Sequence, residues 1–416
     1  MTTETFKQRV LSRAILAATV SVLSACSDMT ALTRLESTAD SAINSNVSKT
    51  VLSFSETTSF DVYVDNNRIH LIAAGMSLNA DKQAVIRHVY SDDNGKHWSE
   101  PSNVLIPKPP SMATRGNDIQ LAVKDDKLVA LWQTTGELLG MGAMVSVYSH
   151  DGGKTWQASP NPAANDSGDQ SHIDIAAAKN GSFHAVWLDD RDENGYQGLR
   201  YARSENAGIH WQKSVTLDDT TCSCCWNKLA FTPTGTINVL YRDMEVRDMA
   251  VSQSTDNGTT WQKLSRAGDF NWKFEGCPHV GGGLAYGNIN GNTVMHSVVW
   301  TGAEHKQGLY YVRSVDNGKL WSPPYKLGKM AVHGDVAVTG DKHIRVVWDE
   351  TGAEGSRVFS AQSDDGGLSW SVAKQWSLPN HNAVQPRIVP AQNGFLLLWT
   401  EKQAKQASQL MTVWVE

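Results

Sequence analysis

Most of this sequence lacks long apolar runs. It also has no excess of basic residues and few cysteines. The sequence has 416 residues, and no stretch after position 25 approaches the roughly 20 apolar residues that a membrane-spanning helix requires. Lys and Arg number 37 against 43 Asp and Glu, so the net charge is −6 and no basic stripe of the kind that binds nucleic acid is present. We therefore expect no helical membrane domain after the N-terminus and no nucleic-acid partner.

The first 25 residues are typical of an export signal. Three basic residues precede the apolar run Ala14–Leu23, which is too short to remain in a bilayer as a helix. The run leads into Leu-Ser-Ala-Cys, which ends at Cys26 and resembles the lipobox of bacterial lipoproteins. This resemblance implies cleavage before Cys26 and acylation of the cysteine, whereas an ordinary secretory signal with a chance cysteine is the alternative.

The segment after the signal predicts where the protein resides. Ser27 provides no signal for retention at the inner membrane, so we expect the lipid anchor in the outer membrane of a bacterial cell envelope. Residues 26–48 are rich in Ser, Thr, Ala and Asn without apolar alternation, and this composition predicts a flexible tether. Residues 49–416 then remain for a single folded domain.

Six copies of one short motif divide that domain into repeats. The motif is Ser-x-Asp-x-Gly-x-x-Trp, and successive copies are 49 to 60 residues apart. Its Asp accepts backbone N–H bonds within a tight turn, its Gly supplies a positive φ, and its Trp starts the return strand with a buried ring. The third positions of the copies are Asp93, Asp151, Asn206, Asp256, Asp316 and Asp365. Hairpin units at such regular spacing predict an all-β repeat fold.

This motif resembles the Asp-box, or BNR, repeat of the sialidase superfamily. The resemblance implies a single β-propeller with the boxes on its periphery, away from any chemistry. A second repeat, a pair of strands, precedes each of the six boxes and occurs once more after the last box. These seven pairs favour seven blades; six blades, the number in sialidases, is the alternative. A strand near Thr50–Ser55 is expected to complete the blade that contains Leu410–Val415 and to close the ring, which removes the open sheet edges.

The starts of the predicted inner strands carry the residues with the most distinctive chemistry. Alignment of these strands places their leading residues on one rim, around the mouth of the axial channel. The residues are Arg115, His172, Cys222, Cys224, Cys225, Cys277, His279 and His333. The two groups of cysteines belong to adjacent blades and contain every cysteine after Cys26.

Three interpretations of these four cysteines remain open. Two disulfides are natural in an oxidising compartment. A metal site is the second, because thiolates and imidazole suit Zn(II) or Cu(I); His279 lies two residues after Cys277, and His172 and His333 are possible further ligands. A redox-active thiol pair is the third. The leading prediction is an envelope lipoprotein that binds Cu or Zn, or a partner such as a glycan or an envelope protein, at the channel mouth.

The resemblance also raises sialidase activity, which needs three arginines for the substrate carboxylate, a Tyr nucleophile with its Glu, and an Asp acid. The expected Arg-Ile-Pro motif is replaced by Arg68-Ile69-His70, and no Tyr follows Tyr325. Sialidase or other glycoside hydrolase activity stays an alternative, as does a protein-interaction scaffold with structural disulfides. Whether the chain is an enzyme stays open. The candidate catalytic residues are Arg115, Asp118, Asp174, Arg242 and Arg247.

Overall fold

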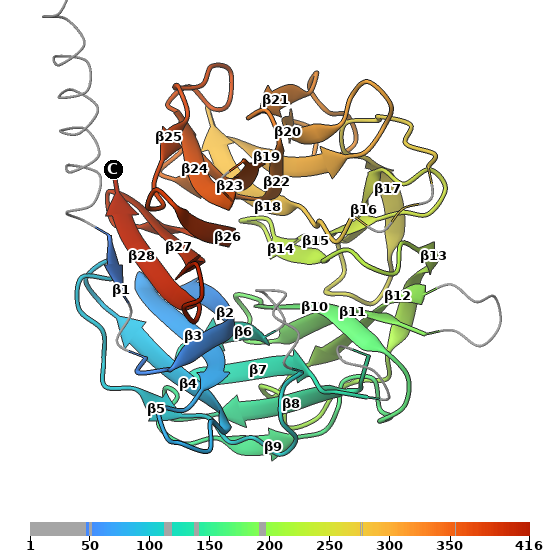
Figure 1. Ribbon diagram of the computed structural model, residues 1–416. Coiled ribbons are helices and arrows are strands. Elements are labelled where there is room, and N and C mark those ends of the chain that lie inside the picture. Colours follow the sequence, from blue (N-terminus) through green and yellow to red (C-terminus); the bar gives the residue numbers. More distant parts are fainter. Residues whose placement is uncertain are drawn as a thin grey trace, which may run out of the picture. The chain divides into compact units, whose positions relative to one another are not determined.

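The protein forms a ring of seven β-sheets in the computed structural model (Figure 1). The structure describes residues 47–49, 52–111, 119–136, 141–190, 197–274, 276, 278–353 and 355–416, which all lie in the unit Asn46–Glu416. Each sheet has four antiparallel strands. No helix within these ranges has the length and apolar character to cross a membrane. The all-β propeller and its seven blades, predicted from the repeats, are therefore confirmed.

Each blade is a meander, and in Figure 1 its first strand lies nearest the centre of the ring. The first three blades contain β2 (Glu56–Asp65), β3 (Arg68–Met76), β4 (Ala84–Ser91) and β5 (Ser102–Asn103); β6 (Ile119–Lys124), β7 (Lys127–Gln133), β8 (Met144–Ser149) and β9 (Gln157–Ser159); and β10 (Gln170–Ala177), β11 (Phe183–Asp189), β12 (Gln197–Ser204) and β13 (Val215–Thr221).

The remaining blades follow the same order around the ring. They contain β14 (Lys228–Phe231), β15 (Ile237–Arg242), β16 (Met249–Ser254) and β17 (Gln262–Arg266); β18 (Gly283–Ile289), β19 (Asn292–Thr301), β20 (Gly308–Ser314) and β21 (Tyr325–Leu327); β22 (Ala331–Thr339), β23 (His343–Gly352), β24 (Gly355–Ser363) and β25 (Lys374–Gln375); and β26 (His381–Ala391), β27 (Gly394–Gln403), β28 (Gln409–Val415) and β1 (Ser48–Lys49).

The ring is closed by β1, which is the outer strand of the last blade. Ser48 pairs with Thr412 in β28, and their hydroxyl oxygens are 3.1 Å apart. The blue β1 therefore lies beside the red β28 in Figure 1. Closure by an N-terminal strand is as predicted, but the strand precedes the expected position at residues 50–55. Leu52 and Phe54 do not extend the sheet, because their side chains are buried in the core between the last and first blades.

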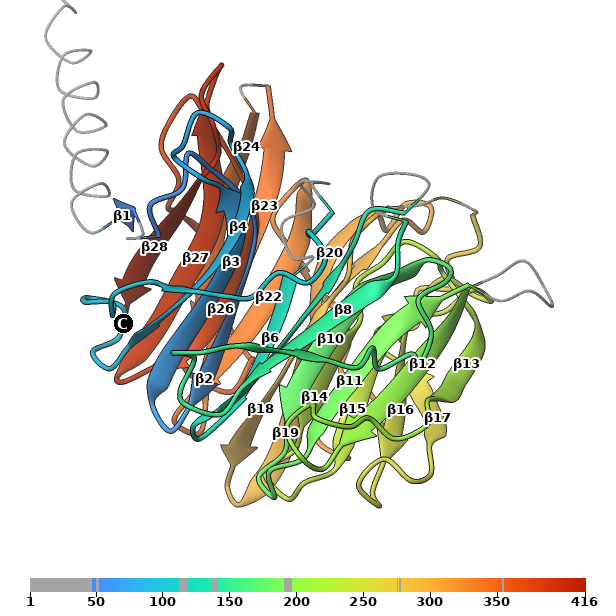
Figure 2. The same ribbon diagram turned by 90° about the horizontal axis from the view of Figure 1, so that it is seen from below.

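The hydrophobic core lies between the blades. In β27, Leu396 and Leu398 belong to the cluster shared with the first blade, whereas Phe395, Leu397 and Trp399 belong to the cluster shared with the sixth blade. The alternating side chains of one strand thus fill two separate interfaces. This explains why the strand is a continuous apolar run, as is typical of strands buried on both faces. Figure 2 shows the same sheets side by side from a direction at right angles to the first view.

The six Asp boxes form turns between the third and fourth strands of their blades. In the second box, the Ser149 hydroxyl donates to Asp151, and the Gly153 N–H donates to the Ser149 oxygen. The hydroxyl and the N–H of Thr155 donate to the Asp151 carboxylate and hold its pKa down at about 2. In the third box the Asn206 side chain likewise accepts the Ser204 hydroxyl and the backbone N–H of His210. The boxes therefore fix turns on the periphery of the ring, as the resemblance implies.

Buried histidines recur in the second strands of the blades. His184 in β11 and His296 in β19 each bond a tyrosine hydroxyl of the following strand at 2.7 Å, namely Tyr201 and Tyr311. In the first blade His70 bonds His88 at 3.0 Å. Burial lowers the pKa of His88, His184 and His296 to about 3 and that of His70 to about 4. These histidines are therefore structural.

Four buried neutral histidines predict a steep loss of stability in acid. Below pH about 6.5 the unfolded chain binds protons that the folded chain takes up only near pH 3 to 4, so the free energy of unfolding falls as pH decreases. We expect His296→Gln to be less stable at pH 8 and to depend less on pH between 6.5 and 4, by up to about 1.4 kcal/mol per pH unit. Urea denaturation at several pH values measures this slope. The exposed His210→Gln is the control, and equal slopes for His296→Gln and the parent protein would refute the prediction.

Candidate functional site

Three carboxylates lie on inner strands around the axis of the ring. Asp61 is in β2, Asp174 in β10 and Asp335 in β22. Each accepts a backbone N–H bond from the next inner strand around the ring; the donors are Leu121, Leu229 and Ile388. The carboxylates thereby connect neighbouring blades at the centre, where no sheet hydrogen bonds join them.

Two cations neutralise part of this acidic charge. Arg387 in β26 donates to Asp335 at 3.1 Å and lies 3.2 Å from an oxygen of Asp61. Lys228 in β14 lies 3.5 Å from Asp174. Burial would lower the pKa of Arg387, but the two carboxylates raise it above its usual range. A sialidase-like site needs arginines that face a substrate, and Arg387 instead holds together the first, sixth and seventh blades.

The charged residues divide the axial passage into two cavities. One, of about 50 Å³, lies toward the starts of the inner strands and is lined by Trp226 and His333. The other, of about 550 Å³, lies toward the ends of these strands and is mostly apolar, with Tyr63, Phe231 and Tyr286 in its wall. Both cavities are lined by Lys228, Asp335 and Arg387.

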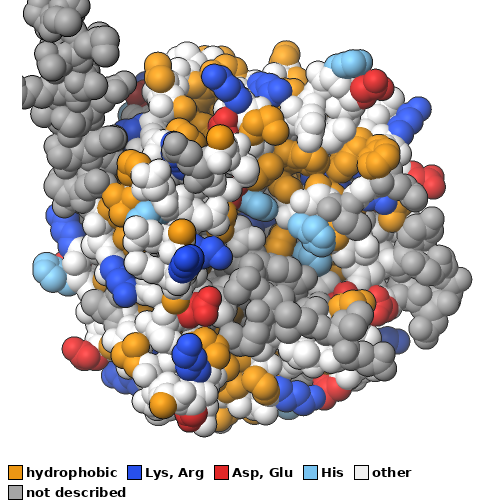
Figure 3. Space-filling view, viewed as in Figure 1, with side chains coloured by type: hydrophobic (Ala, Val, Ile, Leu, Met, Phe, Trp, Pro, Cys, Tyr) orange, Lys and Arg blue, Asp and Glu red, His pale blue; other side chains and the backbone are white. Residues whose placement is uncertain are grey.

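The rim around the smaller cavity has an unusual backbone. Four residues near the starts of inner strands have φ between 40° and 54°; they are His172, His279, His333 and Gln385. Residues other than glycine rarely adopt this left-handed conformation, and such strain is concentrated at functional sites. In β10, β22 and β26 the strand register shifts at this point, as at a β-bulge. Figure 3 shows histidine side chains near the middle of one face of the ring.

Two of the predicted rim histidines are held by their neighbours. His333 contacts both oxygens of the Asp349 carboxylate at 3.0 Å, and the same carboxylate accepts the N–H of Gln385. Burial would lower the pKa of His333, but Asp349 and a hydrogen bond with the His279 backbone raise it. His172 packs edge-on against Trp226, with ring centres 4.9 Å apart. His172 thus connects the third blade with the cysteine segment, whereas His333 and Asp349 connect the sixth blade with residues of the fifth and seventh blades.

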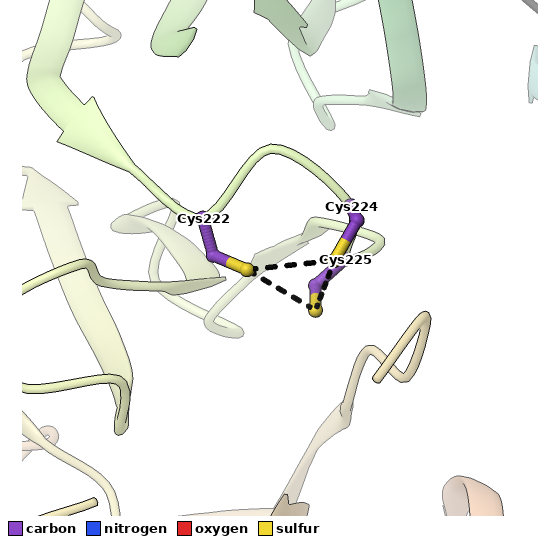
Figure 4. Close-up of side chains that lie close together, drawn as sticks. All are labelled: Cys222, Cys224 and Cys225. Atoms are coloured by element: carbon purple, nitrogen blue, oxygen red, sulfur yellow. Dashed lines mark hydrogen bonds between the residues drawn. The ribbon is translucent and has the colours of Figure 1, made fainter. Parts of the chain in front are cut away.

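Three cysteines form a compact buried cluster in the connection from β13 to β14 (Figure 4). The sulfur of Cys222 is 3.6 Å from that of Cys224 and 3.8 Å from that of Cys225, and the last two sulfurs are 3.9 Å apart. Figure 4 shows all three sulfurs directed toward one another. Each of the three cysteines is at most 4% exposed, and no disulfide joins them.

Two guanidinium groups contact this cluster from the neighbouring hairpin. Arg242, at the end of β15, donates to the Cys225 sulfur at 3.2 Å. Arg247, in the loop before β16, donates to the Cys222 sulfur at 3.4 Å and to the Gly276 carbonyl at 2.8 Å. The hairpin therefore places two positive charges directly on two of the three sulfurs.

This environment differentiates the three thiols. Burial raises the pKa of Cys225, but hydrogen bonds from the other two thiols and the charge of Arg242 outweigh it and hold this pKa well below its usual range. The pKa of Cys224 is raised by its hydrogen bonds to the two neighbouring sulfurs and by burial. For Cys222, the lowering effect of Cys224 is outweighed by the hydrogen bond with Cys225 and by burial, so its pKa is also raised. Of the three thiols, Cys225 is the one whose pKa is lowered.

The structure brings some of the predicted site residues together and leaves others apart. Cys222, Cys224 and Cys225 form the metal-compatible group found in the described part of the chain, and His172, His279 and His333 do not join it. His279 is exposed. Arg242 and Arg247, considered as catalytic candidates, lie on the cysteines, and Asp174 lies on the axis. Four predicted residues fall outside the described residues: Cys26, Arg115, Asp118 and Cys277.

Sequence reasoning did not single out Asp61 and Lys228, and it did not connect Arg242 and Arg247 with the cysteines. A signal for the axial carboxylates was present: Asp174 and Asp335 both follow a histidine by two residues in equivalent inner strands. No local pattern indicates that a guanidinium will contact a sulfur 17 or 25 residues earlier in the chain. That contact depends on how the blade folds back on the connection before it.

Comparisons with known proteins agree with this architecture. The BNR/Asp-box repeat family matches residues 147–158, which include the second box. The polysaccharide lyase Uly1 is similar in structure, with a TM-score of 0.56 and 10% identity over 87% of this chain and 90% of that chain. The chain is an Asp-box β-propeller. The predicted resemblance to the sialidase superfamily is thereby confirmed for the repeat and the fold.

Other solved structures are similar over comparable lengths. A PL25 ulvan lyase bound to a GlcA(1-4)Rha3S unit has a TM-score of 0.54 and 14% identity over 88% of this chain and 93% of that chain. The NanB sialidase from Streptococcus pneumoniae has a TM-score of 0.48 and 13% identity over 89% and 70%. At these identities the similarity to the lyases concerns the fold alone. No curated protein matches this sequence.

The close packing beside the cysteines predicts how the segment responds to a small substitution. A Cβ atom at Gly281 would lie 2.7 Å from the Trp226 carbonyl oxygen and 2.9 Å from the Trp226 Cβ. We expect Gly281→Ala to displace the cysteine turn, to lower the free energy of unfolding by about 1–3 kcal/mol, and to make the thiols react faster with Ellman's reagent. Gly352→Ala, where the nearest atom is 3.8 Å away, is the control. Unchanged stability and thiol reactivity in Gly281→Ala would contradict this packing argument.

Proposed function

We propose that this propeller is an envelope-anchored protein that binds one thiophilic metal ion, Cu or Zn, on Cys222, Cys224 and Cys225. The observation that carries the proposal is the convergence of the three buried sulfurs, at most 3.9 Å apart. Cysteine sulfur is the preferred ligand of both ions in proteins. The anchor rests on the lipobox-like motif that ends at Cys26.

The spacing of the sulfurs suits a metal ion. With metal–sulfur bonds of about 2.3 Å, the ligands of a tetrahedral site are about 3.8 Å apart and those of a trigonal site about 4.0 Å apart. The sulfurs in the protein are 3.6, 3.8 and 3.9 Å apart. An ion placed among them would therefore require shifts of only a few tenths of an ångström. The chemistry that such an ion supplies is strong, directional bonding to thiolates.

The surroundings support metal binding over the alternatives. Three thiols this close together in an oxidising compartment are prone to form disulfides, and a bound ion would protect them. The guanidinium of Arg242 contacts the Cys225 sulfur and helps to lower its pKa, which favours the thiolate form that binds metals. By contrast, the sialidase hypothesis gains no support from the described arginines: Arg242 and Arg247 contact sulfur, and Arg387 is engaged by carboxylates.

Metal analysis of the anaerobically purified chain tests the proposal. We expect one Cu or Zn per chain by elemental analysis, with sulfur neighbours in X-ray absorption spectra. Cys225→Ser should lose the stoichiometric ion because it removes a central ligand, and Ser223→Ala, an exposed neighbour in the same turn, should retain it. Thermal unfolding of each variant shows whether the fold is kept.

Two results would count against metal binding. One is a chain that takes up neither Cu(I) nor Zn(II) while its thiols remain reduced. The other is a chain that has no free thiols after purification under air and that binds no added metal after it has been reduced. The latter would favour structural disulfides.

A further inference from the structure

We infer that Arg242 and Arg247 make the cysteine cluster selective for a monovalent soft cation, Cu(I) or its analogue Ag(I), over a divalent one. This inference rests on the proposed metal binding and specifies which class of ion is bound. It makes the two arginines specificity-determining residues of the site. The argument follows from their burial, their partners and the charge of the occupied cluster.

Both guanidinium groups are buried, and neither has an acidic partner among the described residues. Arg242 is 1% exposed and Arg247 is 6% exposed. The partners of Arg242 besides Cys225 are the backbone carbonyls of Arg247, Val280 and Trp300, together with the face of the Trp272 ring. Arg247 contacts the Gly276 carbonyl and the Met244 sulfur besides Cys222. Among the described residues, no carboxylate forms a salt bridge with either of them.

A buried cation without a counter-charge is strongly destabilising, so these arginines require negative charge nearby. On the axis this requirement is met by carboxylates, since Arg387 contacts both Asp61 and Asp335. Of the groups that the two guanidinium groups contact, the sulfurs are the ones that can carry a negative charge. The cysteines therefore serve as counter-ions of the arginines as well as metal ligands.

The charge of the occupied cluster decides between ions. Three thiolates carry −3 and the two arginines +2, which leaves −1. One monovalent ion brings the sum to zero, whereas one divalent ion brings it to +1. In a buried site of low effective dielectric, an uncompensated unit charge is costly because water cannot screen it. A three-sulfur site with these neighbours therefore favours Cu(I), which is also the softer ion and prefers thiolate ligands.

Substitution of Arg247 isolates this charge. Arg247 holds one backbone carbonyl, whereas Arg242 holds three, so we expect Arg242→Gln to disturb the fold and choose Arg247. Arg247→Gln removes the positive charge and keeps a hydrogen-bond donor; Arg247→Lys keeps the charge. Arg345→Gln is a matched control, because Arg345 is similarly buried, with 7% of its surface exposed. Its side chain contacts Ser360 and Gln362 rather than a cysteine.

The experiment measures the Cu(I) and Zn(II) affinities of the full chain and of each variant under anaerobic conditions, by competition with chromogenic chelators. Thiolates bind Cu(I) more tightly than Zn(II) in general, so the informative quantity is the ratio of the two affinities relative to the parent protein. We expect Arg247→Gln to lower the Cu(I)/Zn(II) ratio by at least about tenfold, since one divalent ion then gives a neutral cluster. Arg247→Lys and Arg345→Gln should change it less than about threefold.

The outcomes separate the inference from the proposed function. Metal bound by sulfur with the same ratio in Arg247→Gln and Arg247→Lys would overturn the inference and leave metal binding standing. X-ray absorption that shows Zn(II) with four sulfur ligands would also overturn the inference. Four thiolates, one divalent ion and the two arginines have a net charge of zero, so the arginines would not disfavour the divalent ion. Absence of stoichiometric binding of either ion to the parent protein would overturn both. Melting temperatures of the variants confirm that the compared chains are folded.

Discussion

The ring depends on how charge is buried at its centre. Inner strands of adjacent blades are not joined by sheet hydrogen bonds there, and Asp61, Asp174 and Asp335 replace them by accepting N–H groups from the next strand. Arg387 then connects two of these carboxylates across three blades. This arrangement fixes the starts of the inner strands relative to one another. The rim residues, and the cysteine segment that leads into β14, are positioned by that fixed frame.

Buried positive charge is treated differently on the axis and at the rim. On the axis the partners of Arg387 are the carboxylates of Asp61 and Asp335. At the rim the partners of Arg242 and Arg247 are sulfur atoms and carbonyls. Sulfur, unlike carboxylate, also binds soft metals and can be oxidised. The need for a partner of buried positive charge is therefore met on the axis by structural carboxylates. At the rim it is met by sulfur atoms that can also bind a metal ion.

The repeats allowed the propeller, its seven blades and its closure to be predicted, because box spacing and strand pairs are local patterns. The boxes could be assigned a structural role for the same reason. The position of the closing strand could not be predicted, because it depends on where Leu52 and Phe54 pack into the core. The cysteines were recognisable as one group, but their separation and their contacts with Arg242 and Arg247 arise from the packing of a hairpin onto the preceding connection. Such contacts leave no periodic trace in a sequence.

Closure of the ring by β1 also sets an order of events during synthesis. The strand that completes the last blade comes first along the chain, and its partner β28 comes last of the strands. Until β28 has emerged, the growing protein consists of an open stack of blades with exposed apolar faces, a form that is prone to aggregate. The final assembly step joins Ser48 and Lys49 to Thr412 and Met411 over more than 360 residues. The ring can therefore close only after the whole chain as far as β28 is available for pairing.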